Sequence, residues 1–112
     1  RCASVEDAAE KALAQVRLGE DGYETAAFLV MTEDEARALC KIIEMVRKDV
    51  SYIDRDSSVF RKGITVTTFY MAKGLEFDQV FIFGRDRENP FFRQFCYICA
   101  TRALHELWVM EL

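Results

Sequence analysis

The first apolar pattern along the chain is helical. Ser4, with Asp7 three residues later, forms a start that resembles a capping box. Apolar residues then recur on one face of a helix, at Ala8, Ala9, Ala12, Leu13 and Val16. Gly19 and Gly22 follow and are expected to end this helix, which we place within residues 1–20.

Short apolar or β-branched runs in the rest of the chain have the length of strands. They are residues 25–31 (TAAFLVM), 50–53 (VSYI), 64–68 (ITVTT), 79–83 (QVFIF) and 104–110 (LHELWVM). Continuous apolar runs are typical of strands that are covered on both faces. In the last run, which alternates, Trp108 is expected in the core and His105 is expected to be solvated or satisfied within the core.

Helices and loops are expected between these strands. A second capping box, Thr32 with Glu35, opens a helix that should reach about Arg47. The remaining segments are a loop at 54–63, a turn or short helix at 71–76, a loop at 84–90 and a helix at 91–103. Strands that alternate with helices predict an α/β fold with a mostly parallel sheet flanked by helices. The length of 112 residues predicts one domain, 1–112.

The composition is that of a globular protein and excludes some classes. Hydrophobic residues make up 51% and charged residues 30%, and no apolar run approaches the ~20 residues that span a bilayer. The net charge of −4 argues against strong autonomous DNA binding, because such proteins usually carry a basic face. The chain begins at Arg1 without a signal pattern, and we expect it to be part of a longer cytoplasmic polypeptide.

The four cysteines include one CxxC, formed by Cys96 and Cys99. A zinc site would need two more ligands, and a redox CxxC opens a helix after a strand. Here the pair lies within the apolar run 91–100, which favours two small buried residues on a helix. The cysteines are therefore expected to be free thiols, as in cytoplasmic proteins.

Two segments carry the candidate chemistry. The first, 67–78 (TTFYMAKGLEFD), leads from a strand into a turn that contains Lys73, Gly74 and Glu76. Gly permits close backbone approach to a phosphate, and a carboxylate accepts hydrogen bonds from ribose hydroxyls. In the second, 97–103 (YICATRA), Arg102 interrupts an apolar helix end. A guanidinium placed against a transferring phosphoryl group stabilises the charge of its transition state.

Together these segments resemble motifs V and VI of superfamily 1 helicases of the UvrD/Rep type. The motif V pattern T-x-H-x-x-K-G-L-E-F is matched at Thr68, Lys73, Gly74, Leu75, Glu76 and Phe77. The motif VI pattern Y-V-x-x-T-R-A is matched at Tyr97, Thr101, Arg102 and Ala103. The short connector between the motifs and the ending TRALHEL are most similar to the HelD branch, also called helicase IV-like.

The resemblance implies the second RecA-like motor domain of such an enzyme and a role for each matched residue. Arg102 would be the arginine finger, and the nucleotide-binding residues would be Gly74, Glu76, Lys73, Thr101 and Arg37. Thr68 and Tyr70 would face nucleic acid. The resemblance further implies ATP with Mg²⁺, and single-stranded DNA as partner.

The chain departs from the family pattern at several positions. Tyr70 replaces the usual His, Phe91 and Phe92 replace acids, and residues 30–32 lack the Tyr-Arg of the UvrD pattern. No G-x-x-x-x-G-K-[ST] phosphate cradle occurs, so ATP and its Mg²⁺ would also need the first RecA-like domain of the same polypeptide. We therefore expect the 112 residues alone to be inactive as an ATPase.

Two alternatives to a DNA helicase remain open. The HelD resemblance and the acidic balance also fit a module that remodels RNA polymerase. The poor match at residues 30–32 also fits a degenerate, non-catalytic RecA-like domain, although Lys73, Glu76 and Arg102 are retained.

Overall fold

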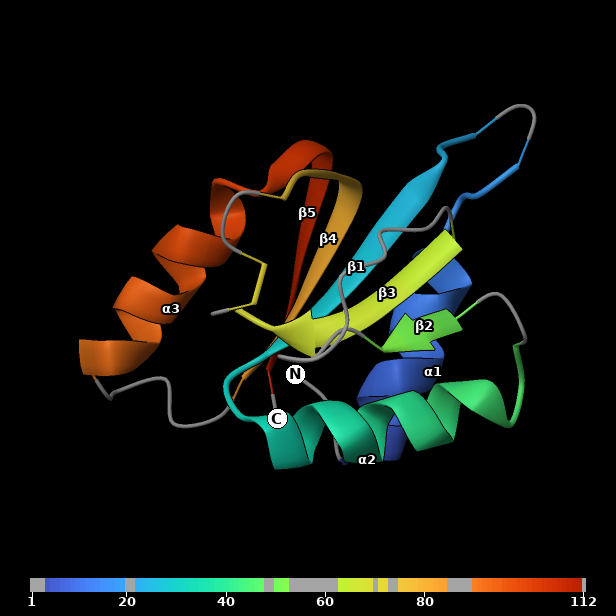
Figure 1. Cartoon of the computed structure of the whole chain (residues 1–112), viewed down its shortest axis with the longest axis horizontal. Coiled ribbons are helices and arrows are strands. Elements are labelled where there is room, and N and C mark those ends of the chain that lie inside the picture. The colour runs from blue at the N-terminus through green and yellow to red at the C-terminus, as the bar shows by residue number, and fades with distance from the viewer. Residues whose placement is uncertain are drawn as a thin grey trace.

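The protein is a five-stranded parallel sheet covered by helices (Figure 1). The computed structural model describes residues 4–19, 22–47, 50–52, 63–69, 71–72, 75–84 and 90–111. The strands are β1 (Thr25–Val30), β2 (Val50–Tyr52), β3 (Gly63–Thr68), β4 (Phe77–Gly84) and β5 (Ala103–Glu111). Their order across the sheet is β2-β3-β1-β4-β5, and every neighbouring pair is parallel. The predicted fold class is confirmed, and a strand lies at each predicted position, with bounds that differ from the predicted ones by one or two residues among those described.

Three helices cover the two faces of the sheet. They are α1 (Val5–Gln15), α2 (Glu33–Glu44) and α3 (Pro90–Ala100). Figure 1 shows α1 and α2 on one side of the sheet and α3 on the other. Residues of α1 and α2 share one apolar cluster with the sheet, and residues of α3 share a second cluster with its opposite face. The sheet is thus buried on both faces, as its apolar strands predict.

The central strand β1 shows how the sequence produces this arrangement. All six of its residues are buried, and successive side chains point to opposite faces. Phe28 and Val30 join the cluster under α1 and α2, whereas Ala27 and Leu29 join the cluster under α3. A continuous apolar run is therefore needed at β1, because neither face is left to solvent.

Both predicted capping boxes begin helices. The Ser4 side chain accepts a hydrogen bond from the Asp7 amide at 3.1 Å and caps α1. The Thr32 hydroxyl accepts from the Glu35 amide at 3.2 Å and donates to the Glu35 carboxylate at 3.0 Å, which caps α2. Each side chain satisfies a donor that the first turn of a helix leaves without an intrahelical partner.

The predicted helix ends are less accurate than the starts. α1 ends at Gln15, before Gly19, because the Arg17 amide donates to the Gln79 side chain at 2.9 Å and not to a helix carbonyl. Gly22 instead permits a tight connector, since a Cβ there would lie 2.0 Å from the Arg17 carbonyl oxygen. α2 ends at Glu44, three residues before the predicted Arg47.

α3 was also predicted too long, to residue 103. It ends at Ala100, because Ala103 pairs with Phe77 in the sheet. Of the predicted loops, 54–62 and 85–89 lie outside the described residues, while Gly63, Gly84 and Pro90 belong to regular elements. In the part of the chain that the structure describes, no helix is long and apolar enough to cross a membrane.

Candidate functional site

The two motif-like segments meet where β4 and β5 begin. Phe77 and Ala103 are partners in the parallel ladder, and the Phe77 amide donates to the Arg102 carbonyl at 2.8 Å. Arg102 therefore lies beside the residues that precede β4, namely Leu75 and Glu76, although 26 positions separate Glu76 from Arg102 in the sequence. The sheet thus places an arginine and a carboxylate at the same end.

The Arg102 side chain is half-buried and oriented by two acceptors. Its Nε donates to the Thr101 hydroxyl at 3.2 Å, and its Nη1 donates to the Leu75 carbonyl at 3.5 Å. Thr101 is itself held, because its hydroxyl donates to the Ile98 carbonyl at 2.7 Å. Within the described part of the chain, these contacts use two of the five N–H donors of a guanidinium, so donors remain for a ligand.

The other residues at this end face solvent. Glu76 and Thr101 are exposed, and Tyr97 is 73% exposed. Tyr97 is the residue that resembles the motif VI tyrosine, and its carbonyl accepts a hydrogen bond from the Thr101 amide at 3.3 Å. Arg102 thus has ordered neighbours of its own chain on one side and solvent beside Glu76 on the other.

Two predicted site residues lie elsewhere. Thr68 is at the opposite, carboxyl end of β3, where it is 5% exposed and its hydroxyl accepts from the Met71 amide at 3.2 Å. Arg37 is exposed on α2, on the face of the sheet that α3 does not cover. The structure therefore joins Glu76, Thr101 and Arg102, but it does not bring Arg37 to them. Tyr70, Lys73 and Gly74 lie outside the described residues.

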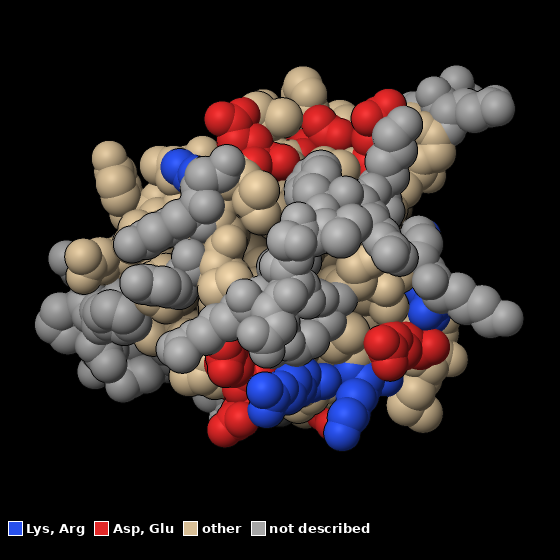
Figure 2. All heavy atoms as spheres, in the orientation of Figure 1, with Lys and Arg blue, Asp and Glu red and all other residues tan. Residues whose placement is uncertain are grey.

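Acidic side chains dominate the end of the sheet at which Arg102 lies. Figure 2 shows them along the upper rim, and exposed or half-buried acids at this end are Glu24, Glu76, Asp78 and Glu106. Basic side chains follow α2 along the lower rim, where Arg37 and Lys41 are exposed. Among the described residues, the cations at this end are Arg17 and Arg102, so these residues form no broad positive field that would attract a phosphate.

Sequence reasoning missed a polar network beside this site. Glu106 accepts hydrogen bonds from Trp108 Nε1 at 3.0 Å, Gln79 Nε2 at 3.2 Å and the Tyr23 hydroxyl at 3.0 Å. Arg17 Nη1 lies 3.7 Å from the same carboxylate. The Trp108 hydrogen bond, with those from Gln79 and Tyr23 and the charge of Arg17, holds the pKa of Glu106 below its usual value. The hydrogen bond that the Tyr23 hydroxyl donates to Glu106 raises the pKa of Tyr23 above its usual value of 10.0.

Gln79 is the buried centre of this network. It is 0% exposed, its Nε2 donates to the Gln15 carbonyl at 2.9 Å, and its Oε1 accepts from the Arg17 amide. Gln79 therefore satisfies the backbone at the end of α1 and connects it to β4. The available signal was a single amide inside the apolar run QVFIF, where an unpaired polar side chain would be costly.

Asp78 fixes the neighbouring strand ends. Its Oδ2 accepts from the amides of Glu24 and Thr25 at 3.0 and 3.2 Å, and its own amide donates to the Thr25 hydroxyl at 2.9 Å. His105, which is exposed, lies with Nε2 3.6 Å from Asp78 Oδ1 and stacks on the Tyr23 ring. These contacts account for His105 as a solvated side chain with structural neighbours.

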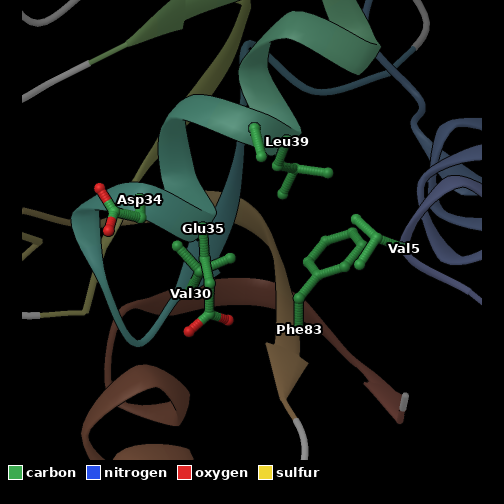
Figure 3. A pocket seen from close by; sticks show the side chains of 7 residues that line it. Val5, Val30, Asp34, Glu35, Leu39 and Phe83 are labelled. Atoms are coloured by element: carbon green, nitrogen blue, oxygen red, sulfur yellow. The ribbon is translucent and has the colours of Figure 1, made fainter.

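A cavity of about 240 Å³ lies at the carboxyl ends of β1 and β4, remote from Arg102. Figure 3 shows its main walls, Val5 of α1, Leu39 of α2, Val30 of β1 and Phe83 of β4. The helices that follow β1 and β4, which are α2 and α3, pack on opposite faces of the sheet, and open α/β sheets commonly bind ligands at such a position. Asp34 and Glu35 also line it, so phosphate groups would be repelled there. Both carboxylates are explained by their place in the first turn of α2.

The CxxC pair lies on α3, as predicted, but of the two cysteines expected to be buried Cys96 is only half-buried. Cys99 is buried, and burial raises the pKa of its thiol to about 12. A thiol with that pKa stays protonated near neutral pH and is a poor nucleophile or metal ligand. Among the described residues, no group of three or more His, Cys, Asp or Glu side chains is placed to hold a metal ion.

Comparison with known proteins agrees with this architecture. Residues 63–110, which contain both motif-like segments, match the family model of the UvrD-like helicase C-terminal domain. The fold is similar to that of a solved structure, the C-terminal domain of a possible DNA helicase from Lactobacillus plantarum WCFS1. The TM-score is 0.74 with 26% identity, and the match covers 96% of this chain and 70% of that chain. No curated protein sequence matches the chain.

The fold and these similarities define the class of the protein. It has the α/β fold of a RecA-like helicase C-terminal domain, with five parallel strands and helices on both faces. Its second half, residues 63–110, is similar to UvrD-like helicase C-terminal domains in particular.

Proposed function

We propose that the chain is the second motor domain of an ATP-dependent superfamily 1 DNA helicase or translocase. In this proposal ATP binds between this domain and a first RecA-like domain of the same polypeptide. Hydrolysis then moves the two domains relative to each other on single-stranded DNA. The family match over residues 63–110 supports this assignment.

The observation that carries the proposal is the contact between the two motif-like segments. Arg102 Nη1 donates to the Leu75 carbonyl, and the Phe77 amide donates to the Arg102 carbonyl. These contacts hold the arginine next to the exposed Glu76. A site that binds a nucleoside triphosphate from one side needs such a pair, a cation for phosphate and an acceptor for ribose.

Each residue of the site has a proposed role that follows from its chemistry. Arg102 would contribute its charge and its remaining N–H donors to the γ-phosphate, which stabilises the charge that develops during transfer. Thr101 orients the guanidinium, and Glu76 would accept from ribose hydroxyls. By resemblance, Lys73 and Gly74 would approach the phosphates. Magnesium would be held by the first domain, which would also supply the phosphate cradle.

The test is ATP turnover by the intact polypeptide that contains this chain, with and without single-stranded DNA. Arg102→Ala should lower kcat by about 10³-fold or more, the usual contribution of an arginine finger. Arg102→Lys should rescue little of it, because a lysine lacks the planar fork. Lys41→Ala, which removes an exposed cation of α2, is the matched control and should leave turnover unchanged.

Each other outcome rejects part of the proposal. Wild-type turnover that survives Arg102→Ala with the fold intact would exclude the arginine-finger role. Absence of turnover in the wild type would favour a degenerate domain. Turnover that responds to RNA polymerase but not to single-stranded DNA would replace DNA as the partner and favour the HelD-like alternative.

A further inference from the structure

The start of β4 departs from regular strand geometry at Asp78. In the ladder between β4 and β5, Phe77 pairs with Ala103. The next pair is Gln79 with Glu106, so two steps along β4 correspond to three steps along β5. Asp78 therefore stands opposite two residues of β5. This arrangement is a β-bulge, which is rare between parallel strands and over-represented beside active sites.

The bulge also changes the face of the sheet to which β4 points. Alternate residues of a strand ordinarily share a face. Phe77 and Gln79 do not, because Phe77 packs in the cluster under α3, whereas Gln79 bonds to the backbone at the end of α1. The bulge therefore leaves Phe77 on the side of α3, where Leu75 also packs. Since Arg102 follows the end of α3 closely, residues 75–77 and Arg102 meet on that side.

The side chain of Asp78 continues the attachment of β4 to β1 where their ladder stops. That ladder begins with the pair Ala26 and Gln79. Ahead of it, Asp78 Oδ2 accepts hydrogen bonds from the amides of Glu24 and Thr25 at 3.0 and 3.2 Å. The Thr25 hydroxyl donates to the same oxygen at 3.3 Å and accepts from the Asp78 amide at 2.9 Å. A carboxylate accepts several donors at once, so β1 stays joined to β4 at the bulge.

Asp78 also contacts β5 across the bulge. His105, one of the two residues of β5 that oppose Asp78, lies with Nε2 3.6 Å from Asp78 Oδ1. The His105 ring stacks on the Tyr23 ring, with 5.2 Å between the centroids. The Tyr23 hydroxyl in turn donates to Glu106, where the ladder with β4 resumes. Asp78 therefore holds both strands that flank β4 at the bulge.

We propose that Asp78 is a positioning residue for Arg102 in the ATPase reaction. The inference rests on the proposed function, since it assigns a residue that aligns the arginine finger of that reaction. In this role Asp78 acts through the backbone and not by contact with the nucleotide. Asp78 holds the bulge, which places the Phe77 amide 2.8 Å from the Arg102 carbonyl and the Leu75 carbonyl 3.5 Å from Arg102 Nη1. Without the hydrogen bonds of Asp78, the start of β4 would shift and move the acceptor of the guanidinium.

A double-mutant cycle of ATP turnover in the intact polypeptide tests this role. Asp78→Ala should lower kcat by about 10- to 100-fold, because a misplacement of ~1 Å can cost about 10²-fold. The KM for ATP should stay within about 3-fold, since alignment of the finger matters chiefly in the transition state. In the Arg102→Ala background, Asp78→Ala should lower kcat by less than about 2-fold, because residues that act as a unit are not additive.

Three further variants separate the hydrogen bonds of Asp78 from its charge and from general stability. Asp78→Asn should keep most of kcat, because its amide oxygen can still accept from the Glu24 and Thr25 amides. Thr25→Val removes the hydroxyl partner and should lower kcat by about 3- to 10-fold, the effect of one hydrogen bond. It also tests the role if Asp78→Ala does not fold. Glu10→Ala, which removes an exposed carboxylate of α1, is the matched control and should leave kcat unchanged.

Hydrogen exchange of the Phe77 amide, measured by mass spectrometry on the intact polypeptide, reports the position of β4 independently of turnover. Asp78→Ala should speed this exchange by about 10-fold, as local opening becomes easier, whereas Glu10→Ala should not change it. Unchanged exchange at Phe77, or an equal loss of kcat in the wild-type and Arg102→Ala backgrounds, would overturn the positioning role alone. Turnover that survives Arg102→Ala would reject the arginine finger of the proposed function, and the positioning role with it.

Discussion

Glu106 and Gln79 show what single residues do at the end of the sheet near Arg102. Glu106 gathers three hydrogen bonds and one cation, and Gln79 links it to the backbone after α1. Neither side chain belongs to the motif-like segments. Both act on the strands that carry those segments, because Gln79 is in β4 and Glu106 is in β5. The network therefore joins β4, β5 and the segment after α1 beside the candidate site, and no motif includes it.

The charge of Glu106 should make the stability of the chain depend on pH. Its pKa is lowered in the folded state, so its contribution is present above the usual value of about 4.5 and is lost as the pH falls through the lowered pKa. Glu106→Gln should lower Tm by about 2–5 °C at pH 7, a typical effect of one polar contact. The difference from wild type should shrink below about pH 4, close to the usual pKa of a glutamate.

Thermal unfolding followed by circular dichroism, from about pH 3 to about pH 8, measures the difference in Tm between wild type and Glu106→Gln. Glu10→Gln, at an exposed position of α1, is the control and should change Tm little at any pH. If the Glu106→Gln deficit stayed constant down to pH 3, roughly a unit below a normal glutamate pKa, the loss would come from packing and not from charge.

At the scale of elements, the Thr32 cap determines where α2 starts. The hydroxyl binds the Glu35 amide and carboxylate, and α2 carries four buried residues of the core, Ala36, Leu39, Cys40 and Ile43. Thr32→Ala should destabilise the chain by about 1 kcal/mol, and Thr32→Ser should retain most of the cap. Urea unfolding midpoints of the three proteins would show this order. Equal midpoints for alanine and wild type would mean that packing alone positions α2.

The accuracy of sequence prediction follows the range of the interactions involved. Starts of α1 and α2 were predictable because each cap lies within four residues of its partner. The end of α1 was not predictable, because it depends on a hydrogen bond from the Arg17 amide to the Gln79 side chain, which is 62 positions away. The end of α3 depends equally on a distant strand, since β4 pairs with Ala103. The motifs identified the residues of the candidate site, but they could not show which of these residues lie together.

At the scale of the whole molecule, the sheet separates the predicted residues into two ends. Glu76, Thr101 and Arg102 lie where β4 and β5 begin, whereas Thr68 lies where β3 ends. The motif V-like segment joins the end of β3 to the start of β4, and Ala72 in it is fully buried. A sequence motif does not show this separation, because it lists Thr68 and Glu76 only eight positions apart.

This separation predicts that variants at the two ends affect different steps of the proposed motor. Thr68→Val removes the hydroxyl that holds the Met71 amide and keeps the buried volume, so it should loosen the segment at the predicted nucleic-acid end. In the intact polypeptide it should raise the single-stranded DNA concentration for half-maximal turnover by about 5-fold, the effect of one hydrogen bond worth roughly 1 kcal/mol. Basal turnover without DNA should stay within about 2-fold, since Arg102 and its acceptors are untouched.

Arg102→Ala should give the opposite pattern, with turnover lost and DNA affinity retained within about 3-fold. Fluorescence anisotropy with a labelled oligothymidylate measures affinity, and phosphate release measures turnover. Thr68→Ser, which keeps the hydroxyl, should behave as wild type in both assays. If Thr68→Val removed basal turnover as completely as Arg102→Ala, the two ends would form one functional unit. The separation seen in the sheet would then not extend to function.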